Sequence, residues 1–248
     1  MLRFHLLPLL IIPAIYVEAA RADSVWDGTL TIAGGAAVSN SAYKKGDTVL
    51  ASPVPFISYD YDRFSIGTEG LSYAVVDEDA VTVLVGLSPE MSPAYPDLNL
   101  YKGLGRDDTA IAYAVAEVGF DHAYVAVTAF HDALGAFDGA GGTVKLGTIV
   151  DVGPVEIDIG AGALISGSRY NQYLYGIDAD EARADRPAFE TKTTLNPFIE
   201  VEATYMISDT VALVGIASYT DLGQHLAKSP LVRNTDIVEA GVYLGYQF

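Results

Sequence analysis

Acidic side chains in the second half of the sequence alternate with apolar ones, the spacing that separates the two faces of a β-strand. From Val155 to Ile165 the odd positions are aliphatic or alanine, while the even positions are acidic, small or polar apart from Leu164. The carboxylates on such polar faces are Glu156, Asp158, Glu200, Glu202 and Glu239. In the lumen of a barrel they are either solvated or paired with arginines, or they line a passage that prefers cations.

Hydrolytic chemistry has little support in the sequence. Two histidines have an acid beside them, in the pairs Asp121-His122 and His131-Asp132. Neighbours on a strand face opposite ways, so neither pair forms a base with its orienting acid. No G-x-S-x-G, H-E-x-x-H or phosphate-loop pattern occurs, and the lack of cysteine excludes thiol nucleophiles. We therefore predict no catalytic residue, metal or cofactor; a membrane-embedded hydrolase with a nucleophile near His131 or His225 is the weaker alternative.

The charge balance of the chain is strongly acidic. Its 248 residues include 14 Lys and Arg against 32 Asp and Glu, a formal net charge of -18. Such a chain repels the phosphates of nucleic acid, which excludes that class of partner. Half of the residues are hydrophobic and 16 are tyrosine, a composition typical of a folded protein and not of a disordered acidic chain.

The chain consists mainly of segments about ten residues long with the period of β-strands. Tight connections alternate with long ones at 39–53, 89–108, 132–142, 167–195 and 220–236. This layout predicts an all-β transmembrane antiparallel barrel with short periplasmic turns and long external loops. The eleven candidate strands are Thr29–Val38, Val54–Tyr61, Phe64–Val75, Val81–Ser88, Thr109–Phe120, Ala123–His131, Thr143–Val150, Val155–Ser166, Asn196–Ile207, Val211–Tyr219 and Ile237–Phe248.

The sequence also predicts the number of strands and a short helix in one loop. Bacterial single-chain barrels have an even number of strands, so we predict about twelve, with ten as the alternative. The missing strand is expected in the proline-rich region 89–101. The stretch 178–189, DADEARADRPAF, carries helix-favouring residues and is predicted to form one or two helical turns.

A soluble periplasmic β protein would also alternate, but with its apolar faces inward. Three features favour the inverted arrangement of a membrane barrel. The polar faces are rich in glycine and poor in lysine, tyrosines gather near strand ends, and the last segment ends on Phe248. We therefore expect hydrocarbon, and not a protein interior, around apolar residues such as Ile157 and Val242.

Residues 1–22 have the features of a secretory signal peptide. Arg3 gives a basic start, an apolar stretch runs from Leu6 to Val17, and Ala20-Arg21-Ala22 has the small-x-small arrangement of a cleavage site. The apolar run is about half of the ~20 residues that a membrane-spanning helix needs. We expect cleavage after Ala22, which leaves residues 23–248 as one exported outer-membrane barrel domain.

Three stretches carry a family resemblance. An aromatic stretch contains Tyr170, Asn171, Gln172, Tyr173, Tyr175 and Gly176. A later Ser-Pro-hydrophobic-Val pattern contains Ser229, Pro230, Leu231 and Val232, and a Gly-Arg-Asp stretch contains Gly105, Arg106 and Asp107. In these motifs, and over essentially the whole mature chain, the sequence resembles the MipA/OmpV family, named for a protein that interacts with the murein transglycosylase MltA.

The resemblance implies an outer-membrane β-barrel of Gram-negative bacteria, in contact with outer-membrane lipids and lipopolysaccharide. For the founding member it implies a scaffold that links a murein lytic transglycosylase to a murein synthase. Tyr246 and Phe248 would form the C-terminal signal that the outer-membrane assembly machinery reads. We therefore predict a non-enzymatic scaffold or interaction protein, with a small-solute, cation-preferring channel as the alternative.

Overall fold

The computed structural model describes residues 28–44 and 50–248. The predicted signal peptide, residues 1–22, lies outside the described residues and stays a prediction. Within them no helix is long and apolar enough to cross a membrane.

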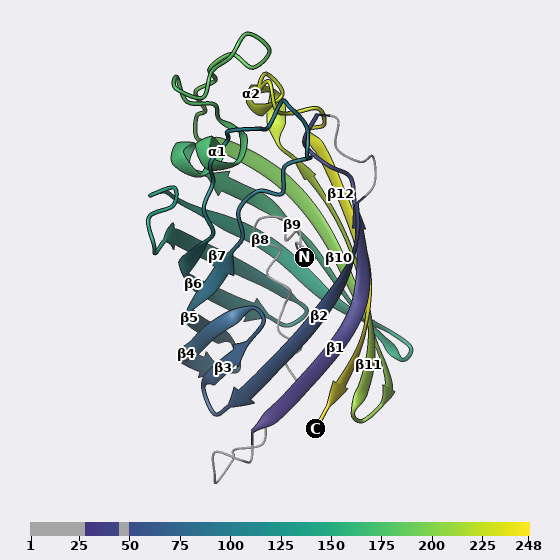
Figure 1. Ribbon diagram of the computed structural model, residues 1–248. Helices are drawn as coiled ribbons and strands as arrows, with labels where there is room; N and C mark the ends of the chain where they lie inside the picture. The colour runs from purple at the N-terminus through teal and green to yellow at the C-terminus, as the bar shows by residue number, and fades with distance from the viewer. Residues whose placement is uncertain (1–27, 45–49) are drawn as a thin grey trace.

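The described residues form one closed barrel of twelve antiparallel strands, in which β12 pairs with β1 (Figure 1). This confirms the predicted fold class and strand number. The strands are β1 (Thr29–Ser39), β2 (Leu50–Tyr61), β3 (Phe64–Gly67), β4 (Gly70–Glu78), β5 (Val81–Glu90), β6 (Thr109–Phe120), β7 (Ala123–Asp132), β8 (Ala140–Val152), β9 (Val155–Ser166), β10 (Thr194–Ser208), β11 (Val211–Asp221) and β12 (Asp236–Gln247). Two short helices, α1 (Ser168–Tyr175) and α2 (Gly223–Leu226), lie in the loops.

The twelfth strand is not in region 89–101, where we expected it. The candidate strand 64–75 is instead divided into β3 and β4 by a turn at Thr68 and Glu69. Glycines flank this turn, and Gly70 has a φ of 113°, which disfavours any side chain. A Cβ at Gly70 would also lie 2.0 Å from the carbonyl oxygen of Leu87 on β5. The glycine spacing was the signal for a strand break.

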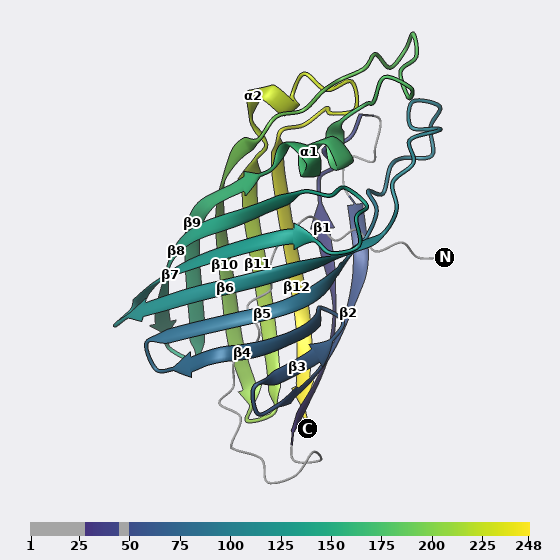
Figure 2. The same ribbon diagram turned by 90° about the vertical axis from the view of Figure 1, so that its left-hand side faces the viewer.

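The two ends of the barrel have different connections (Figure 2). Two-residue turns at 62–63, 79–80, 121–122, 153–154 and 209–210 make up one end, which we call the turn end. The long connections and both helices make up the other end, which we call the loop end. The predicted alternation of short turns and long loops is confirmed, except that β3 and β4 are joined on the loop side by the two-residue turn at Thr68 and Glu69. In outer-membrane barrels the short turns face the periplasm.

The apolar faces of the strands point outward. On β12, Val242 is 57% exposed and Leu244 is 53% exposed, whereas Gly241 and Gly245 are buried on the inner face. Many other strand aliphatics are also exposed, which a soluble sandwich would bury. The barrel therefore has the inverted polarity of a protein surrounded by hydrocarbon.

The predicted helical turns in 178–189 are wrong. That stretch contains a tight turn in which Arg183 and Arg186 pair through their backbone groups. The helix α1 forms earlier in the loop, at Ser168–Tyr175, where helix-favouring composition is weaker but tyrosines become buried. Burial of an apolar face outweighs intrinsic propensity in so short a helix.

Candidate functional site

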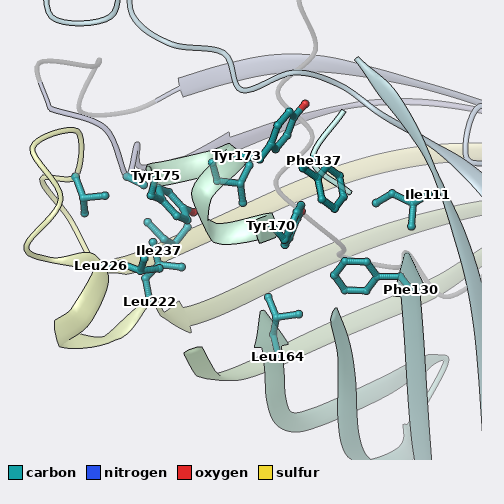
Figure 3. Packing of buried hydrophobic residues seen from close by; sticks show 13 residues of the cluster. Ile111, Phe130, Phe137, Leu164, Tyr170, Tyr173, Tyr175, Leu222, Leu226 and Ile237 are labelled. Carbon is teal, nitrogen blue, oxygen red and sulfur yellow. The ribbon is translucent and has the colours of Figure 1, made fainter. Parts of the chain in front are cut away.

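A packed cap closes over the loop end of the lumen. Helix α1 lies across this end, and its tyrosines pack with residues from the loop-end parts of β6, β7, β9 and β12 (Figure 3). Tyr170 is fully buried, with its ring 5.3 Å from that of Phe130 and 5.0 Å from that of Phe137. The buried members of this cluster are Ala42, Ile111, Phe130, Phe137, Leu164, Tyr170, Tyr173, Leu174, Tyr175, Leu222, Leu226, Val232 and Ile237.

The cap brings the three family-motif stretches into contact. Arg106 donates hydrogen bonds from Nε to the carbonyl oxygen of Tyr173 (2.8 Å) and from Nη2 to that of Gly176 (3.3 Å). Ser229 donates from Oγ to the carbonyl oxygen of Tyr175 (2.7 Å). Both contacts satisfy carbonyl groups at the C-terminal end of α1, which have no partner within the helix.

A buried ion pair holds the same region. Arg106 donates to both carboxylate oxygens of Glu181, at 2.6 and 3.1 Å, and the two side chains are 9% and 12% exposed. Burial alone would raise the pKa of Glu181. Hydrogen bonds from Arg106 and from the backbone N–H of Asp178 outweigh that effect and hold the pKa below its usual range. The pair is therefore charged throughout the physiological range.

A second buried arginine, Arg186, has its charge solvated by backbone carbonyl oxygens. The guanidinium of Arg186 donates to the carbonyl oxygens of Leu100 (2.7 Å), Lys102 (3.2 Å) and Glu181 (2.6 Å). Its side chain is among the largest that are fully buried. These bonds tie the loop between β5 and β6 to the loop that follows α1, so the cap is one connected unit.

The other motif residues also have structural contacts. Asn171 is fully buried; it accepts from Ser166 Oγ and donates to the carbonyl oxygens of Ser166 and Lys192 and to Thr194 Oγ1. Gln172 accepts from the backbone N–H of Thr191. Gly176 packs against Gln172, which leaves no space for a Cβ. The carbonyl oxygen of Asp107 accepts from Tyr173 Oη, and that of Leu231 accepts from Tyr101 Oη. Pro230 lies half-buried between buried neighbours.

Below the cap, one lysine meets several acids in the lumen. Lys145 Nζ on β8 lies 2.5 Å from Glu200 on β10 and 3.6 Å from Asp158 on β9. Tyr124 on β7 donates to Asp158 at 2.6 Å, and Lys145 lies over its ring, 5.1 Å from the centroid. A Cβ at Gly160 would lie 2.5 Å from Lys145 Cε, so the glycines on the inner face make room for this lysine.

The structure brings together three of the five predicted acids. Glu202 is directly opposite Asp158 in the pairing of β9 and β10, and Glu200 shares the face. The buried oxygens Asp158 Oδ1 and Glu202 Oε2 accept no hydrogen bond from the described residues. Glu156 lies exposed at the turn end, and Glu239 lies on β12, away from Lys145. The expected arginine partners do not appear in this cluster, and Lys145 on β8 takes their place.

The histidines do not form a catalytic pair in the described part of the chain. His131 Nδ1 lies 2.6 Å from the backbone oxygen of Asp132, not from its carboxylate. That carboxylate accepts from Thr109 and from four backbone N–H groups of the following loop. The ring of His225 packs on Phe189. No group of three or more potential metal ligands occurs among the described residues.

A closed antiparallel barrel with aliphatic outer faces, a polar lumen and one end of short turns defines an outer-membrane β-barrel protein of Gram-negative bacteria. The amino-acid sequence also assigns the protein to a family. Residues 32–248 match the family described as MltA-interacting protein MipA, and the chain belongs to that family.

Relatives agree with this assignment. Outer membrane protein OmpV of Vibrio cholerae is 25% identical over 77% of this chain and 76% of its own length. The MltA-interacting protein of Escherichia coli strain K12 is 24% identical over 98% of each chain. Among solved structures, the CymD monoaromatic hydrocarbon channel covers 88% of this chain and 87% of its own, with 8% identity and a TM-score of 0.45.

Proposed function

We propose that the protein is a scaffold or interaction protein that holds murein-processing enzymes at the outer membrane and carries out no catalysis itself. Its proposed partners are a murein lytic transglycosylase and a murein synthase. The name of one relative, MltA-interacting protein, supports the first of these. Outer-membrane lipids and lipopolysaccharide are the proposed surroundings, and Tyr246 and Phe248 the proposed signal for the assembly machinery.

The charge at the turn end is the observation that carries this proposal. Eight exposed acids gather on or beside the two-residue turns: Asp62, Asp77, Glu78, Asp79, Asp121, Asp151, Glu156 and Asp209. Among the described residues, the only Lys or Arg at this end is Arg63, which donates to the carbonyl oxygen of Val75. An exposed surface of one sign attracts a partner of the opposite sign and speeds its association. The turn end is therefore suited to a basic surface on a periplasmic enzyme.

The experiment is a binding assay between the protein in detergent and a purified murein lytic transglycosylase. The variant Asp77→Asn, Glu78→Gln, Asp79→Asn removes three charges from one turn. The matched control Asp97→Asn, Asp180→Asn, Glu190→Gln removes three exposed charges from the loop end. We expect the first variant alone to lose affinity and salt dependence. Equal binding by both variants, or none by the unmodified protein, would contradict the proposal.

A small-solute channel is the second candidate, and the lumen cluster is what favours it. Asp158, Glu200 and Glu202 face a single Lys145, so the inner wall has an excess of negative charge. Such a wall would prefer cations. Planar-bilayer recordings under reversed salt gradients test this directly: cation-selective steps that weaken in Glu202→Gln support a channel, and a silent bilayer excludes it.

A further inference from the structure

The barrel wall contains a seam without backbone hydrogen bonds. Strand β2 pairs with β3 only at 58–61, and β4 pairs with β5 only from Leu71 opposite Leu87 toward the turn end. Toward the loop end, β2 continues through 52–56 and β5 through 88–90. Among the described residues, no backbone hydrogen bond joins these two stretches across the wall. Figure 1 shows the short β3 beside the lower part of β2 only.

Prolines line both edges of this seam. Ile57 donates its N–H to Thr68 Oγ1 and accepts from the Thr68 N–H, so the odd-numbered residues of β2 turn their backbone groups toward β3. Pro53 and Pro55 share that orientation, but they have no N–H. On β5 the carbonyl of Leu87 faces β4. Pro89, two residues further, therefore also turns its missing donor toward the seam.

The edges are thus adapted to remain unpaired. In a membrane each unsatisfied N–H costs several kcal/mol, and proline removes the donor instead of pairing it. An added β-strand would need those donors, so the prolines also disfavour a protein strand as the occupant. The outward side chains at the base of the seam, Ile57 and Leu87, are exposed and aliphatic. Hydrocarbon is therefore the medium outside it.

The lumen side of the seam combines apolar and acidic groups. Val54 and Phe56 point inward from β2, and Glu90 points inward from the end of β5, where it accepts from Tyr170 of the cap at 3.1 Å. The cap covers the loop end of the lumen, whereas no backbone hydrogen bond among the described residues closes the wall at the seam. The carboxyl group of Glu90 and the excess of acids over Lys145 in the lumen favour cations over anions.

We propose that this seam is a lateral portal through which apolar cations pass between the outer leaflet and the lumen. The apolar body enters between β2 and β5, and Glu90 receives the positive charge. This activity is separate from the proposed scaffold role, because it uses the wall and lumen and leaves the turn end free.

The first experiment asks whether lipid reaches the seam. Single-tryptophan variants are made in a Trp26→Phe background: Phe56→Trp at the seam, Phe198→Trp facing the lumen from the fully paired β10, and Phe64→Trp on the outer surface. All three are refolded into vesicles of brominated phospholipid, which quenches tryptophan on contact. We expect Phe56→Trp and Phe64→Trp to lose most of their emission and Phe198→Trp to retain it. Retained emission from Phe56→Trp means that lipid does not reach the lumen side of the seam, and overturns the portal.

The second experiment identifies the charge of the solute. Tetraphenylphosphonium, an apolar cation, should restore the emission of Phe56→Trp by displacing lipid from the seam, and tetraphenylborate, an anion of the same shape, should not. Adding Glu90→Gln keeps an acceptor for Tyr170 but removes the ionisable carboxyl group, and should abolish the effect of the cation; Glu190→Gln, at an exposed position of the loop end, is its matched control. Equal effects of the two ions, or no effect of Glu90→Gln, would refute the assigned solute class.

Discussion

The loop end and the turn end of the barrel are built in opposite ways. At the loop end, several charged groups are buried and bonded within the chain, as in Arg106 with Glu181 and Arg186 with three carbonyl oxygens. At the turn end, acids are exposed, and Arg63 is the only Lys or Arg at that end among the described residues. The loop end therefore uses its polar groups to stay closed, while the turn end leaves its charges available to another molecule.

Removing Arg106 tests the closed end most severely. Arg106→Ala leaves Glu181 buried without its partner and removes hydrogen bonds to the carbonyl oxygens of Tyr173 and Gly176. We expect the cap to lose about 3 kcal/mol of stability, since breaking a buried pair from one side costs several kcal/mol. Protease cleavage in the loops of vesicle-embedded protein measures this, while heat-dependent gel migration reports the intact barrel. The exposed pair of Arg169 and Asp138 supplies the control Arg169→Ala, which should leave the loops resistant.

Asn171→Ala should have the next largest effect. The change removes an amide that makes four hydrogen bonds in a fully buried position. We expect a loss of about 2 kcal/mol, because Ser166 and Thr194 are left with unsatisfied buried groups. Hydrogen exchange of the amides in α1 measures it. Unchanged protection in α1 would show that the helix is held by its tyrosines alone.

Acid should weaken the cap before it affects the barrel. The pKa of Glu181 in the folded protein lies below its ordinary value of 4.5, so its contribution to stability is present above that value. The contribution is lost as the pH falls through the depressed pKa of the folded state. Loop proteolysis with an acid-tolerant protease should therefore rise below the ordinary value. The Glu181→Gln variant should not show this added sensitivity.

The smallest effect on stability is expected at the turn end. Neutralising Asp77, Glu78 and Asp79 changes exposed side chains, and such changes usually shift stability by no more than about 0.5 kcal/mol. The temperature at which the heat-dependent gel shift occurs should stay the same. A clear gain in that temperature would show that repulsion between these acids costs folding energy, and a clear loss would show that they hold the turns.

Much of the fold could be predicted from the sequence because its causes are local. Alternation along β12 and turn residues such as Asp62 and Asp121, both at positive φ, act over a few positions. The break between β3 and β4 was missed because 64–75 was predicted as one strand, although its exposed apolar positions change from even (Phe64, Ile66) to odd (Leu71, Tyr73, Val75) across the turn. The prediction of a helix at 178–189 failed because Arg186 bonds to distant carbonyls, which propensity does not register.

The candidate site was less predictable. Strand parity indicated that Asp158, Glu200 and Glu202 share the inner face, but not that Lys145 would reach two of them from β8. Strand parity predicts which face of the barrel wall a residue is on, but not its position along the barrel axis. Glu156 was therefore grouped with Asp158, Glu200 and Glu202, although it lies exposed at the turn end. The motif residues were recognised as a set, yet their contacts join loops far apart in the sequence.

The pairing of β1 with β12 has a consequence for assembly. Thr31 is opposite Gln247, so the first and last strands of the described chain meet only after every strand between them has been laid down. Until then the growing sheet has two open margins, each able to join another molecule. Closure is thus a single late event over a very long sequence distance, which makes it slow. Shielding those margins is a task for whatever delivers the chain to the membrane.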